Sequence, residues 1–211
     1  MSQLEYLIAL VSIIVGLGLT DLARSLRELV RPARTVHWHW LPLAWAAIAF
    51  LVIVQIWWQS FRFLQKEALA HAAVFTPVLL GFLLLYLICA FALPDPDRTR
   101  LGTDGARTSD TRAVLDLEAF YFSVAHRRWF FGAFIGLLVA SQLFSGAAWA
   151  VQDTQIVETA RLVQNIAVNL GLASLLGGLI ITDRRWVHGG AALLVLGALV
   201  YTLLTSVSAI G

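Results

Sequence analysis

Charged residues are scarce in this chain. Only 13% of its 211 residues are Asp, Glu, Lys or Arg, whereas 59% are hydrophobic. A typical soluble domain carries about 25% charged residues, so this composition excludes an ordinary soluble globular protein. The composition instead predicts a protein that exposes most of its surface to lipid.

Cysteine and lysine are almost absent. The single cysteine, Cys89, excludes a disulfide within the chain and a metal site built from several cysteines. The single lysine, Lys66, lies between apolar stretches, which argues against a retinal Schiff base inside the membrane. No histidine, acidic residue or arginine is expected near the bilayer midplane, where haem ligands and proton relays would lie. We therefore predict no cofactor.

Long apolar stretches, by contrast, are abundant. A helix needs about 20 apolar residues to cross the hydrocarbon core, and six stretches approach this length. They are Leu4–Leu22, Leu41–Phe61, Ala72–Leu93, Trp129–Trp149, Leu162–Ile181 and Val187–Val207. We predict an all-α, polytopic membrane protein in which residues 1–211 form a single transmembrane domain, a six-helix bundle.

The longest connection, residues 94–128, contains a further helical pattern. Its second half, "AVLDLEAFYFSVAHRRWFF", repeats apolar residues such as Leu117, Phe120, Tyr121 and Val124 at helical spacing. We predict an interfacial amphipathic helix that lies among the headgroups before the fourth span. Docking of a protein partner on this helix is the alternative.

Basic residues mark one side of the bundle. Most of the 15 Lys and Arg residues follow the first, third and fifth stretches. Because basic residues accumulate in cytoplasmic loops, we place these segments, with the loop 94–128, in the cytoplasm. Both termini are then expected outside it, as in a multi-pass protein of a bacterial inner membrane. This basic surface would attract anionic headgroups, so the net charge of +2 requires no nucleic-acid partner.

Uncharged polar side chains recur within the stretches. At a rise of 1.5 Å per residue, several lie roughly 8 to 12 Å below the outer boundary, and one lies a turn above. These residues are Ser12, Gln55, Gln142, Asn169 and Thr202, with Asn165 a turn above Asn169. Amides and hydroxyls at this depth need partners. They either join the helices by hydrogen bonds or line a polar cavity for water, an ion or a small ligand.

A second polar group is expected at the cytoplasmic helix ends. It consists of Asp21, Arg24, His126 and His188. A leucine stripe continues beyond Asp21, so we expect the first helix to extend into water with Arg24 available as an ion-pair partner. A gate, a cation site or a pH-sensitive latch is the alternative. We predict no metal site, because only His37 and His39 share a local spacing and that spacing is weak.

Three functions fit these patterns, in this order of preference. The first is a homo-oligomeric channel or facilitator for an ion or small neutral solute, with the outer polar layer as its selective region. The second is a non-catalytic scaffold or accessory subunit that binds a protein partner through its cytoplasmic loops. The third is a membrane enzyme with a His/Asp site at the cytoplasmic face. No family resemblance is evident in the motifs.

Overall fold

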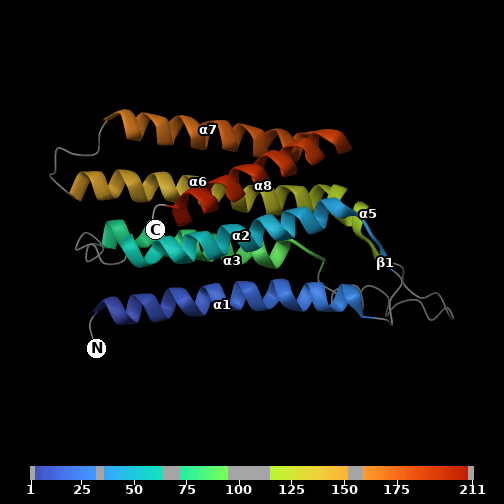
Figure 1. Cartoon of the computed structure of the whole chain (residues 1–211), viewed down its shortest axis with the longest axis horizontal. Coiled ribbons are helices and arrows are strands. Elements are labelled where there is room, and N and C mark those ends of the chain that lie inside the picture. The colour runs from blue at the N-terminus through green and yellow to red at the C-terminus, as the bar shows by residue number, and fades with distance from the viewer. Residues whose placement is uncertain (1–2, 32–35, 64–71, 95–114, 152–158, 209–211) are drawn as a thin grey trace.

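The computed structural model is a bundle of long helices (Figure 1). It describes residues 3–31, 36–63, 72–94, 115–151 and 159–208, so residues 95–114 of the expected loop 94–128 lie outside the described part. Within the described residues, six helices are long and apolar enough to cross a membrane, which confirms the predicted number of helices of that length and character. They are α1 (Gln3–Val30), α2 (Trp40–Phe63), α3 (Ala72–Phe91), α6 (Val124–Val151), α7 (Thr159–Ile181) and α8 (Arg185–Ser208).

The long helices alternate in direction along the chain (Figure 1). At one end of the bundle α1, α3 and α7 finish and α2, α6 and α8 begin. We call this the basic end, because it carries most of the described arginines, including Arg24, Arg127 and Arg185. Helix α1 continues past Asp21 to Val30, as the leucine stripe predicted.

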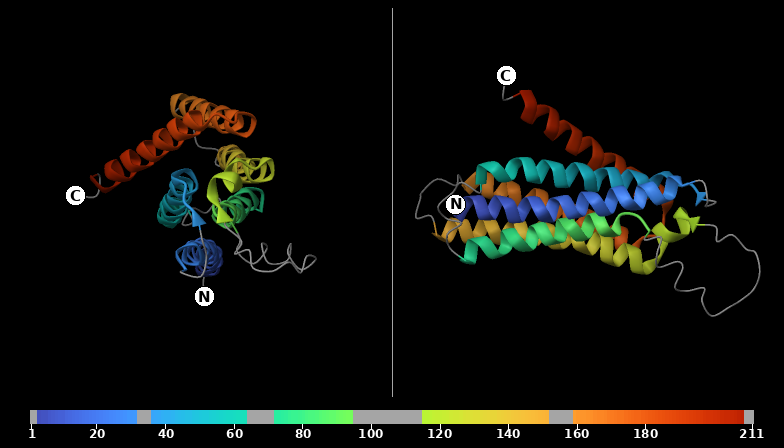
Figure 2. Two further views of the ribbon diagram at one scale, coloured as in Figure 1. Left: turned by 90° about the vertical axis from the view of Figure 1, so that its right-hand side faces the viewer. Right: turned by 90° about the horizontal axis from the view of Figure 1, so that it is seen from below.

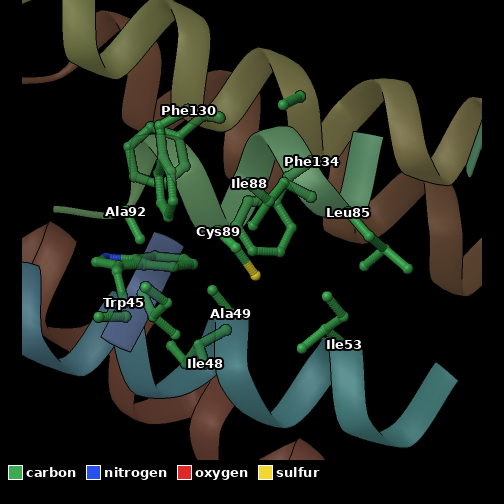
Figure 3. Packing of buried hydrophobic residues seen from close by; sticks show 14 of the residues in the cluster. Trp45, Ile48, Ala49, Ile53, Leu85, Ile88, Cys89, Ala92, Phe130 and Phe134 are labelled. Atoms are coloured by element: carbon green, nitrogen blue, oxygen red, sulfur yellow. The ribbon is translucent and has the colours of Figure 1, made fainter. Parts of the chain in front are cut away.

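Helix α3 organises the packing, since it contacts α1, α2 and α6 and packs most extensively on α6. Side chains of α2, α3 and α6 interlock in the middle of the bundle (Figure 3). The indole of Trp45 makes edge-to-face contacts with Phe130, Phe131 and Phe134, at centroid distances of 5.9, 5.0 and 5.9 Å. Such aromatic pairs add stability beyond the area that they bury.

Helices α7 and α8 are less enclosed. Helix α7 packs mainly on α6, and α8 packs mainly on α2. Figure 2 shows α8 leaving the bundle at an angle, so that its C-terminal end lies apart from α7. Residues 163–168 of α7 are exposed on every face of the helix. The part of the bundle remote from the basic end is therefore open around these two helices.

The helix expected before the fourth span is present but short. Helix α5 (Leu117–Phe122) starts where the Asp116 carboxylate accepts hydrogen bonds from the backbone N–H groups of Glu118 and Ala119, at 2.9 and 3.1 Å. The bond from Ala119 is the main reason that the pKa of Asp116 lies below its usual range. Just before it, β2 (Leu115–Asp116) pairs in parallel with β1 (Val36–His37).

One face of helix α5 packs on the rest of the chain. It packs against α2, α6 and β1. The side chains of Leu117 and Tyr121, which were expected to face headgroups or a partner, are fully buried within the chain. Burial of this face is more favourable than partial burial at an interface, because both side chains leave water entirely.

Gly18 sets the distance between α1 and its neighbours. A Cβ atom on Gly18 would lie 3.1 Å from Ile53 Cδ1 and 3.5 Å from Cys89 Cβ, whereas one on Gly16 would meet no described atom within 4 Å. We predict that Gly18→Leu lowers the free energy of unfolding by about 1–3 kcal/mol, because the added atoms force the helices apart. Thermal unfolding in detergent measures this, with Gly16→Leu as the control. Equal melting temperatures for the two variants would contradict the packing.

Candidate functional site

A groove of about 620 Å³ lies at the basic end. It runs over the end of α3, with α1 on one side and the start of α6 on the other. Its polar lining consists of Asp21, Arg24, Ser25, Tyr86, Ser123 and His126. Its apolar lining includes Leu87, Phe91, Phe120 and Trp129. An apolar surface with a few convergent polar groups is typical of a small-molecule site.

Three of the four residues expected at the cytoplasmic helix ends meet in this groove. Asp21 and Arg24 reach it from α1, and His126 reaches it from the first turn of α6. Tyr86 of α3 lines the same groove, close enough to the Asp21 carboxylate to interact with it. Sequence analysis missed Tyr86, because an aromatic residue inside an apolar stretch gives no signal of a polar partner on another helix.

His126 is the most constrained polar group of the groove. Its side chain is only 8% exposed. Its ring lies between Phe120 and Phe130, with centroid distances of 4.4 and 5.2 Å. The buried Nε2 atom has no hydrogen-bond partner among the described residues. An unpaired buried polar group costs about 1–3 kcal/mol, so a bound molecule that pairs with this imidazole would recover that energy.

The fourth expected residue, His188, belongs to a separate buried network. Its Nε2 lies 2.9 Å from the backbone oxygen of Thr182, and its Nδ1 lies 2.8 Å from the Tyr121 hydroxyl. A carbonyl oxygen can only accept, so Nε2 carries the proton and Nδ1 accepts from Tyr121. Burial raises the pKa of Tyr121, which keeps this hydroxyl protonated as the donor.

Arg127 completes this network. Its side chain is 4% exposed, donates to the same Thr182 oxygen at 2.6 Å and pairs with the Asp183 carboxylate at 2.5 Å. We call Tyr121, Arg127, Thr182, Asp183 and His188 the Tyr121–His188 network. A second ion pair of 2.5 Å joins Glu118 to Arg185. Together these contacts fasten α5 and α6 to the turn between α7 and α8.

The six residues of the expected outer polar layer differ in exposure. Asn165 and Thr202 are exposed, whereas Ser12, Gln55, Gln142 and Asn169 are partly buried. Thr202 donates to the backbone oxygen of Ala198 in its own helix, at 2.5 Å. Gln142 is the one member whose Nε2 is buried without a partner among the described residues. None of the six lines the groove.

The described residues contain no group of three or more His, Cys, Asp or Glu side chains placed to hold a metal ion. His39, which shares a local spacing with His37, accepts a hydrogen bond from the Leu41 backbone at 3.3 Å and so helps to start α2. Comparison of the chain with models of protein families, with curated proteins and with solved structures gave no match.

Removing the Tyr121 hydroxyl tests the Tyr121–His188 network. We predict that Tyr121→Phe lowers the free energy of unfolding by about 1–3 kcal/mol, because Nδ1 of His188 then stays buried without a donor. Chemical denaturation in detergent measures this loss. The control is Tyr6→Phe, which changes a tyrosine that is 61% exposed. A loss no larger than that of the control would show that the network contributes little stability.

Proposed function

We propose that the chain is a multi-pass membrane protein that binds a membrane amphiphile in the groove, at the level of the cytoplasmic headgroups. Four exposed tryptophans support this depth, because indoles gather where hydrocarbon meets water. They are Trp38, Trp40, Trp129 and Trp186, all at the basic end. With this end in the cytoplasm, both termini lie on the other side of the membrane.

One observation carries the proposal: the groove combines an unpaired, buried imidazole with a carboxylate, a guanidinium and an apolar wall. His126, Asp21 and Arg24 supply the polar groups. Phe91 and Trp129 supply apolar surface beside them. A molecule with a polar head and a hydrocarbon tail can satisfy both kinds of surface at once. Among the functions expected from the sequence, binding of an amphiphile is nearest to the facilitator. The proposed site, however, lies at the basic end and not in the outer polar layer.

A bulky side chain in the groove tests the proposal. Ala125 lines the groove and is exposed, so Ala125→Trp should fill it without disturbing the core. We predict that cross-linking by a phospholipid with a photoreactive acyl chain falls at least about threefold at the Leu87–Phe91 segment, which lines the groove where the tail would lie, because the groove is occluded. Peptide mass spectrometry of the reconstituted protein measures the yield.

The control is Ala167→Trp, which enlarges an exposed alanine of α7 far from the groove. This variant should cross-link like the unmodified protein. Equal yields from Ala125→Trp and from the unmodified protein would reject the groove as the binding site.

Gln142 favours a second candidate function, the homo-oligomeric channel or facilitator. Its Nε2 is buried without a described partner, and such an amide costs several kcal/mol at membrane depth. A passing ion, solute or water chain would supply the partner. Neighbouring copies would enclose the exposed polar side chains of α7 and α8.

Flux into liposomes tests this candidate. We predict that Gln142→Leu and Asn169→Leu abolish uptake of a small neutral solute such as glycerol, because they remove the polar contacts along its path. Gln164→Leu is the matched control, since Gln164 is an exposed amide of α7. No uptake by the unmodified protein, or equal uptake by all variants, would reject the channel.

A further inference from the structure

We infer that the groove selects amphiphiles whose headgroup carries both an anionic phosphate and a primary ammonium, as an ethanolamine phospholipid does. The inference rests on the proposed function, because it names the ligand class of the same groove. Its basis is the pairing of opposite charges on one wall, where Asp21 and Arg24 of α1 both line the cavity.

The spacing of these charges fits such a headgroup. Asp21 and Arg24 are three residues apart on α1, so they are neighbours on one face of the helix. Their separation along the helix is less than one turn of about 5.4 Å. A headgroup that joins phosphate to ammonium through two methylenes spans a comparable length. Helical side chains lean toward the N-terminus of their helix, which brings the long Arg24 side chain back toward the level of Asp21.

Each charged group suits one part of the headgroup. The Arg24 guanidinium can donate two parallel hydrogen bonds to a phosphate. The Asp21 carboxylate offers about four lone-pair sites, so contact with Tyr86, which also lines the groove, leaves acceptors for the N–H groups of an ammonium. The imidazole of His126, in the wall formed by α6, adds a further polar contact.

The same groups disfavour other common headgroups. A glycerol headgroup keeps the phosphate charge and lacks the ammonium, so Asp21 would meet only neutral hydroxyl groups. A choline headgroup keeps the positive charge but has no N–H to donate, and its three methyl groups need more space. Selectivity therefore comes from Asp21, whereas Arg24 contributes to the binding of every phospholipid.

Native mass spectrometry of the purified protein measures this selectivity. The probes are phospholipids with identical acyl chains and ethanolamine, choline or glycerol headgroups, offered at equal concentration. We expect the ethanolamine lipid to bind about tenfold better than the other two, the size of one charge-assisted hydrogen bond. Asp21→Asn should reduce this preference to about twofold or less. Arg24→Gln should instead weaken the binding of all three lipids to a similar extent.

Matched variants separate these effects from general changes in charge. Glu5→Gln removes a carboxylate at the other end of α1, and Arg27→Gln removes an exposed arginine that does not line the groove. Both should keep the preference of the unmodified protein. The melting temperature of each variant shows that it is folded, and asparagine at position 21 keeps the size and one acceptor oxygen of the aspartate.

The possible outcomes distinguish this inference from the proposed function. If Ala125→Trp abolishes binding but the three headgroups bind equally well, the inference is overturned and the proposed function stands. Binding that Ala125→Trp does not change would overturn both. A preference for the glycerol headgroup, or displacement of the lipid by an equal concentration of water-soluble glycerophosphoethanolamine, would also overturn the inference. The latter result would mean that the recognised ligand comes from water.

Discussion

The structure depends on one constraint, that polar side chains inside an apolar bundle must find partners within the chain. The Tyr121–His188 network meets this constraint at the basic end, where His188 and Arg127 both donate to the Thr182 oxygen and the Tyr121 hydroxyl donates to His188. Because these groups come from α5, α6, α8 and the turn before α8, the network fixes four parts of the chain relative to one another. Losing Tyr121 would leave Nδ1 of the buried His188 without a donor.

The groove forms because the Tyr121–His188 network holds these parts of the chain in place. The network holds α5 against α6, and the Phe120 ring of α5 then packs at a tilt against His126, so that α5 and α6 form one wall. The other wall is α1, which Gly18 allows to approach α2 and α3. Since α1 and α6 both pack on α3, the end of α3 forms the floor between them. The polar groups that the network does not use, Asp21 and His126, therefore face a shared space.

Sequence patterns predicted the helices well, because helix length and apolar character follow from contiguous residues. The extension of α1 beyond Asp21 also followed from a local leucine stripe. Contacts between distant residues were not predictable, since depth along a helix says nothing about its rotation or tilt. Tyr121 and His188 lie 67 positions apart, Asp21 of α1 and Tyr86 of α3 line the same groove, and Asn165 and Thr202 of the expected polar layer are exposed. A helix before the fourth span was expected, but its start and short length were not, because Asp116 was not recognised as its N-cap.

The central claim is that the groove between α1 and α6 is a binding site for an amphiphile from the bilayer. A density map of the protein in nanodiscs of native lipid tests this claim most directly. The account predicts an elongated density in the groove, with its polar end between Asp21, Arg24 and His126 and its tail along Phe91 and Trp129. A groove that holds only isolated water peaks, or that is closed by protein density, would contradict it.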